Sequence, residues 1–174
     1  MNRLFKCILP LLCLSLLLAS GCSSKPAETP RDYSDFSGCP VFHDAAFGTP
    51  VGDFLALCGT PDRSDVNYGL YTYENQQVLG HSATVEATLL PQEEGGEAVL
   101  QGVSVRFGSA EEETLAEELS ASLADLCGSA LTGTPGAASA LAVYDARFVL
   151  GRTAVSLYSY GDGTVYLDFA PMQD

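Results

Sequence analysis

Cysteine carries the most reactive side chain in this chain, and the part that we expect to fold contains Cys39, Cys58 and Cys127. A thiolate can act as a nucleophile or join a redox pair. Three thiols allow at most one disulfide within the monomer, with three possible pairings. Cys58 and Cys127 each stand in an apolar stripe just before an expected helix end, where the helix dipole raises a thiol pKa. The pattern favours buried thiols over a bridge or a catalytic cysteine.

Histidine, serine and the acidic residues form no catalytic or metal-binding pattern. His43 and His81 are not at metal-ligand spacing from a cysteine or from each other. No Gly-x-Ser-x-Gly step is present. The acidic groups at 93–97, 111–113 and Asp162 lack the spacing of an EF-hand calcium loop. We therefore expect no enzyme activity, no metal and no cofactor.

Tyrosine is more informative, because two pairs of tyrosines stand two residues apart in expected strands. Tyr71 and Tyr73 share one strand face, and Tyr158 and Tyr160 share another. If helices cover one face of the sheet, tyrosines on the other face form an amphipathic surface of the kind that binds partners. Ordinary cross-strand packing is the alternative. We predict these four tyrosines as candidate partner-binding residues.

The elements that carry these residues occur twice along the chain. VLGHSA at 78–83 returns as VLGRTA at 149–154, an offset of 71 residues. Leu-Cys-Gly at 57–59 returns at 126–128, an offset of 69 residues. Two matches at nearly one offset indicate an internal duplication of roughly 70 residues.

A helix opens each copy. Thr49 and Pro50 are typical of the start of the first helix, and Ser109 with Glu112 predicts a capping box at the start of the second. Both helices are expected to end at Leu-Cys-Gly, because glycine suits the left-handed residue that follows a helix.

Strands follow each helix. Gly80-His81 and Gly151-Arg152 are expected at the tips of equivalent hairpins, where glycine supplies a positive φ. Each copy then reads as one helix and three strands. The predicted fold class is α+β, a tandem α-β-β-β repeat with two helices packed on one face of an antiparallel sheet of about six strands.

The N-terminus contains basic residues, an apolar run and then a cysteine. Arg3 and Lys6 precede a run that is too short to span a membrane. The ending LASGC at 18–22 resembles the lipobox of bacterial lipoproteins, with Ala19 where leucine is usual. The resemblance implies lipid attachment at Cys22 and a domain held at the extracytoplasmic face of the cell membrane.

The chain is expected to divide into three parts. Residues 1–21 form the signal peptide, and residues 22–38, rich in Ser, Pro, Thr and charges, are typical of a flexible tether. Residues 39–174 suffice for a single domain. The duplication divides this domain into repeats at about 43–108 and 109–174.

The chain is strongly acidic. Its 8 basic and 22 acidic residues give a formal net charge of −14 at pH 7. Loss of two basic residues with the signal peptide makes the mature chain more negative still. Because nucleic acid is repelled by such a chain, the expected partners are the membrane, through the lipid anchor, and a protein.

A family resemblance covers residues 47–107 and recurs at 115–169. A short helix ending in LCGTPD, followed by Gly-x-Tyr-x-Tyr at 69–73 and two strands, resembles the repeat of BamE-type outer-membrane assembly lipoproteins. In tandem, the unit resembles the β-lactamase inhibitor protein. Members of this fold bind other proteins through the sheet face or its loops.

Together these patterns predict a membrane-anchored extracytoplasmic lipoprotein. We expect it to act as a non-enzymatic protein-binding, assembly or inhibitor-like module. The alternative is a cell-envelope hydrolase or thiol-redox enzyme whose site is not readable from the linear sequence.

Overall fold

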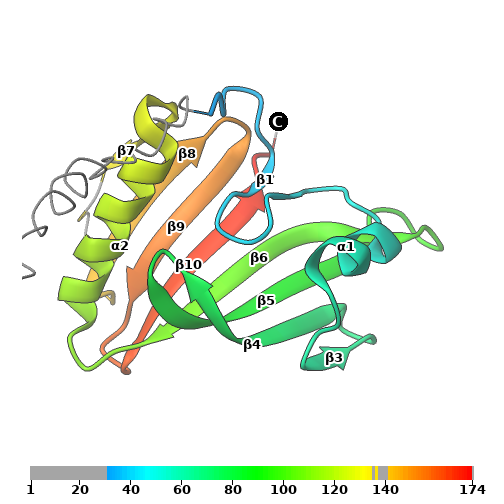
Figure 1. Cartoon of the computed structure of the whole chain (residues 1–174), viewed down its shortest axis with the longest axis horizontal. Helices are drawn as coiled ribbons and strands as arrows, with labels where there is room; N and C mark the ends of the chain where they lie inside the picture. Colours follow the sequence, from blue (N-terminus) through cyan, green and yellow to red (C-terminus); the bar gives the residue numbers. More distant parts are fainter. Residues whose placement is uncertain (1–30, 135, 137–140, 174) are drawn as a thin grey trace, which may run out of the picture.

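The computed structural model describes residues 31–134, 136 and 141–173. Its main feature is an eight-stranded antiparallel sheet in the order β3-β4-β5-β6-β10-β9-β8-β7 (Figure 1). β1 and β2 form a separate two-stranded sheet. The strands are β1 (Gly38–Cys39), β2 (Ala45–Ala46), β3 (Arg63–Asp65), β4 (Leu70–Val78), β5 (His81–Pro91), β6 (Ala98–Gly108), β7 (Leu131–Thr134), β8 (Tyr144–Leu150), β9 (Thr153–Ser159) and β10 (Thr164–Pro171). The described helices are α1 (Val51–Cys58), α2 (Glu112–Cys127) and the short 3-10 helix η1 (Gly128–Ala130).

The fold is therefore mainly β, and the predicted α+β class with about six strands was wrong. The prediction missed β3 and β7, the two outer edges of the large sheet. β3 is the polar, exposed segment Arg-Ser-Asp, and β7 is Leu-Thr-Gly-Thr, so neither shows the alternation of apolar and polar residues that marks a strand. Each pairs with one neighbouring strand only, and that pairing is what makes it a strand.

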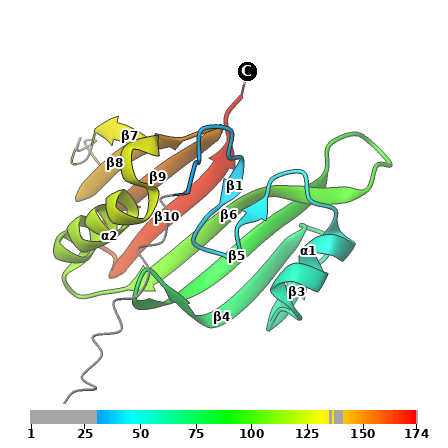
Figure 2. The ribbon, with the colours of Figure 1, turned by 45° about the horizontal axis from the view of Figure 1, so that its top comes forward.

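The two halves of the chain contribute the same series of elements. α1 precedes β3 to β6, and α2 precedes β7 to β10, so each unit has four strands rather than the predicted three. In each half the strands follow one another from an outer edge of the sheet to its centre, where β6 and β10 pair (Figure 2). This is the arrangement that a duplication would produce, although the duplication itself stays a prediction.

Both predicted hairpins are confirmed, but their turns differ by one residue. In the first, Val78 pairs with His81, so the turn is Leu79-Gly80 and the predicted turn at Gly80-His81 was wrong by one residue. In the second, Leu150 pairs with Thr153, so the turn is Gly151-Arg152. The pairing of β4 with β5 also shifts between Tyr73 and Gln76, an irregularity that bends a strand. The first hairpin accordingly curves over the sheet toward α2 (Figure 1).

The helix ends agree with the sequence, but the expected capping box does not form. Gly59 and Gly128 follow the two helices with positive φ. At the start of α2, the Ser109 hydroxyl accepts a hydrogen bond from the Glu111 amide. The Glu112 carboxylate instead accepts hydrogen bonds from the amides of Gly161, at 2.8 Å, and Gly163. Glu112 therefore ties α2 to the β9–β10 turn.

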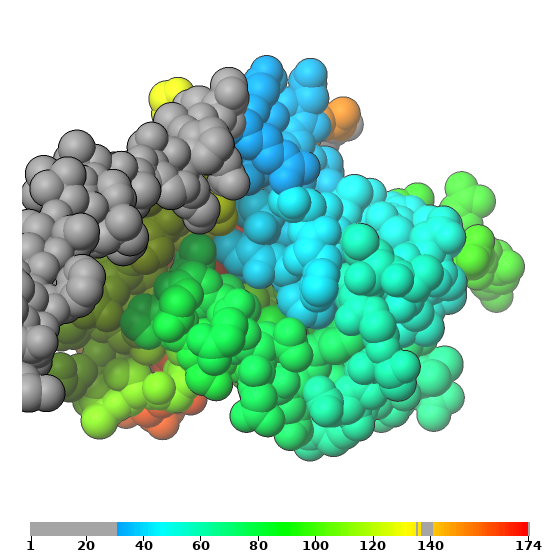
Figure 3. Space-filling view, in the orientation of Figure 1, coloured from blue at the N-terminus to red at the C-terminus, as the bar shows by residue number. Residues whose placement is uncertain are grey.

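Residues 31–50 lie across the sheet between α1 and α2, over β6 and β10 (Figures 2 and 3). The Gly38 amide donates to the Thr153 hydroxyl at 2.9 Å, and the Arg152 amide donates to the Phe36 carbonyl at 2.7 Å. Tyr33 is buried. The predicted tether, residues 22–38, was therefore too long, because residues 31–38 belong to the folded domain. The polar composition of residues 22–38 indicated a flexible tether. A polar composition does not prevent backbone groups from forming hydrogen bonds, and such bonds hold residues 31–38 to the sheet.

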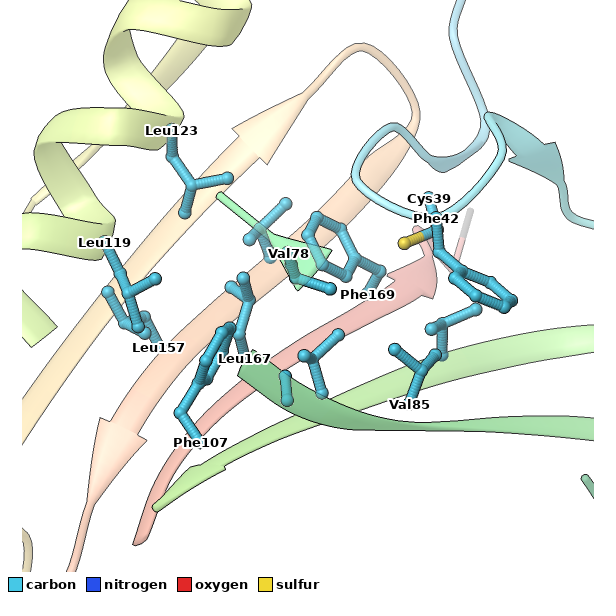
Figure 4. Close-up of a cluster of buried hydrophobic side chains, with 14 of the residues drawn as sticks. Cys39, Phe42, Val78, Val85, Phe107, Leu119, Leu123, Leu157, Leu167 and Phe169 are labelled. Atoms are coloured by element: carbon cyan, nitrogen blue, oxygen red, sulfur yellow. The ribbon is translucent and has the colours of Figure 1, made fainter. Parts of the chain in front are cut away.

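One hydrophobic core lies between the large sheet and the elements that cover it (Figure 4). α2 contributes Leu119 and Leu123, while the N-terminal segment contributes Cys39 and Phe42. The central strands contribute the remaining side chains, including Val105, Phe107, Leu157, Leu167 and Phe169. Because the core side chains of the strands point to one side of the large sheet, the alternate residues of the strands must point to the other side.

Candidate functional site

The most extended candidate surface is the open face, the side of the large sheet turned away from the helices and residues 31–50. One row of residues crosses it in register, with one residue from each strand. The row is Arg63, Thr72, Glu86, Ser104, Asp168, Ser156, Arg147 and Thr134. Every member is polar, whereas the neighbouring rows on the other side supply the core. This row makes the open face polar along its length, while Leu70, Ala154 and Val149 on the same face are apolar.

Three tyrosines lie together on the open face near the β9–β10 turn. We call Tyr158, Tyr160 and Tyr166 the tyrosine cluster. The rings of Tyr158 and Tyr166 are stacked, with centroids 5.1 Å apart and planes 9° apart. The Tyr160 ring lies 5.4 Å from that of Tyr158 and 6.2 Å from that of Tyr166. Tyr160 is 55% exposed, so the cluster offers aromatic surface to solvent.

Two carboxylates hold the phenols of the cluster. The Tyr158 hydroxyl donates to Asp168 at 2.7 Å, and Ser104 donates to the same carboxylate at 2.6 Å. The Tyr166 hydroxyl donates to Asp162 at 3.1 Å. Burial, and then the hydrogen bond to Asp168 and the charge of that carboxylate, raises the pKa of Tyr158. The phenol therefore stays protonated and keeps its ring in place.

Three arginines also lie on the open face, and each is paired with a carboxylate beside it. The N–O distances are 2.8 Å for Arg63 with Glu74, 3.4 Å for Arg106 with Glu86 and 3.4 Å for Arg147 with Asp145. Exposed pairs of this kind add little stability. Their effect here is to offset the charges of Glu74, Glu86 and Asp145. No such pairing with a cation occurs at Asp162 or Asp168 within the described residues.

The structure separates the four predicted tyrosines. Tyr158 and Tyr160 lie on the open face, but Tyr71 and Tyr73 point into the core and are buried. The Tyr73 ring lies 5.1 Å from that of Phe42, and its hydroxyl donates to the Gly59 carbonyl at 3.2 Å. Burial raises the pKa of Tyr73 to about 12. For Tyr71 and Tyr73 the prediction of a partner-binding role was wrong, because a buried side chain presents no surface.

The sequence reasoning named Tyr158 and Tyr160 but missed the groups that hold them. Tyr166 and Asp168 alternate along β10 with the buried residues Val165 and Leu167, so the sequence contained a signal for their shared face. It contained none for the pairing of Tyr166 with Tyr158, since that depends on strand register.

The three cysteines in the described part of the chain, Cys39, Cys58 and Cys127, are free thiols. Burial raises the pKa of Cys39, and it raises the pKa of Cys58 and of Cys127 to about 11 in each case. The reactive form of cysteine is the thiolate, which these environments disfavour at neutral pH. The geometry therefore supports a packing role for the three side chains.

The described residues contain no group of three or more His, Cys, Asp or Glu side chains that could hold a metal ion. His43 is exposed, and the nearest carboxylate oxygen to His81 belongs to Glu118, 3.9 Å away. A hollow of about 1070 Å³ lies between the end of α2, η1 and residues 31–34. Arg31, one of its lining residues, is already paired with Asp44 at 2.5 Å.

Comparison with known proteins does not place the chain in a family. No protein family, no curated protein and no solved structure matches it.

Proposed function

We propose that the chain is a lipid-anchored, extracytoplasmic binding module that contacts a protein partner through the open face. The observation that carries the proposal is the tyrosine cluster, which lies on the open face beside the polar row. Tyrosines that are partly exposed and held by hydrogen bonds supply contact area at little entropic cost, which suits a binding surface. The sheet beneath them positions these rings without requiring a conformational change.

The anchoring part of the proposal rests on the sequence. Cys22, the expected lipid attachment site, lies outside the described residues. Within those residues no helix is long and apolar enough to span a bilayer. Replacing Cys22 with Ala should release the chain from the membrane fraction and abolish its acylation, whereas Cys58→Ala should change neither. Equal membrane retention of the two variants would contradict the anchor.

A non-enzymatic role agrees with the chemistry of the thiols better than a redox role does. A redox pair needs two sulfurs in reach and at least one accessible thiolate. Cys39 and Cys127 are buried, and burial raises the pKa of all three thiols. On the open face, a shallow hollow of about 410 Å³ is lined by charged side chains, but both of its arginines, Arg63 and Arg106, are already paired with carboxylates.

The test is a photoreactive side chain at Ser156, in the middle of the open face, within the full lipidated chain. We expect one recurrent protein to be crosslinked, with capture lost when the tyrosine cluster is disrupted by Tyr160→Ala. A matched probe at Asp53, which is exposed on α1 on the opposite side of the sheet, should not capture that protein. Capture of nothing specific at Ser156, or equal capture at both positions, would sink the proposal.

A further inference from the structure

We infer that the tyrosine cluster, together with Asp162 and Asp168, is a binding site for an arginine side chain on the surface of a protein partner. The inference deepens the proposed function and rests on it. It names the chemistry of the partner at one place on the open face, the end of β9 and β10 beside the β9–β10 turn.

Two carboxylates lie beside the rings of the tyrosine cluster. Asp168 accepts hydrogen bonds from Ser104 and Tyr158, and Asp162 accepts them from the Thr164 amide and Tyr166. All four donors are neutral groups, so none of these hydrogen bonds brings a positive charge to either carboxylate. The three arginines of the open face are each occupied by another carboxylate. Asp162 and Asp168 are therefore two carboxylates beside the rings for which no ion pair is found among the described residues.

The aromatic rings of the tyrosine cluster also attract cations. An aromatic ring attracts a cation to its face through its quadrupole. When a phenol O–H donates a hydrogen bond to a carboxylate, electron density on the phenol oxygen increases. Part of this density is delocalised into the ring, so the ring is more electron-rich than that of a phenol bound to water. Tyr158 and Tyr166 both make this bond, and the exposed ring of Tyr160 lies against them. Ring and carboxylate thus attract the same kind of group.

The site suits an arginine side chain better than other cations. A guanidinium is planar, so it can stack on the Tyr160 ring while its N–H groups reach a carboxylate such as Asp162. An ammonium group cannot make both contacts as fully. The site is also a surface rather than an enclosed pocket, so it suits one residue of a larger protein interface rather than a free small molecule.

The nearest arginine of the chain itself does not fill the site. Arg106 pairs with Tyr166 across the sheet, but its guanidinium is 3.4 Å from Glu86, on the far side from Tyr158. Arg31 lies over the rings of Tyr33 and Phe36, at the other side of the sheet. The surface of the tyrosine cluster therefore remains available to a partner.

The experiment uses the full mature chain with 13C-labelled tyrosine rings and two capped tripeptides, Gly-Arg-Gly and Gly-citrulline-Gly. Citrulline has nearly the shape of arginine without its charge. We expect the arginine peptide to shift the ring signals of Tyr158, Tyr160 and Tyr166 saturably, and added salt to weaken this binding. Tyr160→Ala and Asp162→Asn should each weaken it about two- to fivefold, the size of an exposed cation–π contact.

Tyr68→Ala is the matched control, because Tyr68 is also highly exposed but lies in the β3–β4 turn at the other end of the sheet. Equal shifts with the arginine and citrulline peptides, or an equal loss in Tyr68→Ala, would overturn the inference. If the probe at Ser156 captures its partner under those conditions, the proposed function survives that result. If the probe captures nothing, the proposed function fails whatever the peptides do.

Discussion

Two pairs of tyrosines with the same spacing have opposite fates in this molecule. Tyr71 and Tyr73 of β4 are buried beneath the N-terminal segment and α1, whereas Tyr158 and Tyr160 are directed to the open face. The covering helices differ in the same way. α1 has 8 residues and buries one side chain, Phe54, while α2 has 16 residues and buries a stripe of leucines. Tyr73 packs against Phe54 of the short helix, whereas the long helix supplies leucines of its own to the core.

The doubled hexapeptide shows that a motif that occurs twice in one chain need not keep its orientation. The hexapeptide turns at Leu79-Gly80 in the first copy and at Gly151-Arg152 in the second. A shift of one residue exchanges the two faces of a strand. Ala83 is accordingly buried in the core, whereas Ala154, its equivalent in the second hexapeptide, lies on the open face between the buried residues Thr153 and Val155.

The largest expected difference between the two pairs is in stability. Tyr73→Ala removes a ring packed against Phe42 and Phe54 and should lower the free energy of unfolding by about 3 to 5 kcal/mol. Tyr160→Ala, on the open face, should change it by less than about 0.5 kcal/mol. Urea unfolding of the two variants measures both values. Similar losses would mean that the two pairs are not on opposite faces.

A smaller effect is expected where α2 holds the turn beside the tyrosine cluster. Glu112→Ala leaves the amides of Gly161 and Gly163 without their carboxylate and should lower the free energy of unfolding by about 2 kcal/mol. Glu113→Ala, one residue along in the same helical turn but exposed, is the control. The Tyr160 and Tyr166 ring signals should shift in Glu112→Ala only. If both variants behaved alike, the link from α2 to the turn would be discarded.

The smallest expected effect appears at high pH. The folded-state pKa of Tyr73 is about 12 against its ordinary value of 10, so the unfolded chain loses this proton first as the pH rises. Stability from Tyr73 is complete below pH 10 and is lost as the pH rises through about 12. Tyr73→Phe should make the decline of stability over this range shallower, and Tyr160→Phe should leave it as it is. A decline unchanged by Tyr73→Phe would contradict the burial of this phenol.

The sequence predicted the parts of the fold that depend on local residue choice. Glycine at 59 and 128 marked the helix ends, and glycine at 80 and 151 marked the hairpins. It could not predict features that depend on pairing between distant segments. The polar edge strand at Arg63–Asp65 exists only because β4 lies beside it. The same limit applies to the site, because which face a tyrosine occupies follows from register and from the length of the helix opposite.

The incorporation of residues 31–38 into the fold also sets the height of the domain above a membrane. If Cys22 carries the lipid, as we propose, only residues 23–30 separate it from Arg31, and eight residues fully extended reach about 28 Å. Through the hydrogen bonds of Gly38 and Arg152, a pull on the anchor would act directly on the β8–β9 hairpin. Such a domain is confined to a layer close to the lipid, and its partner must present its arginine within that layer.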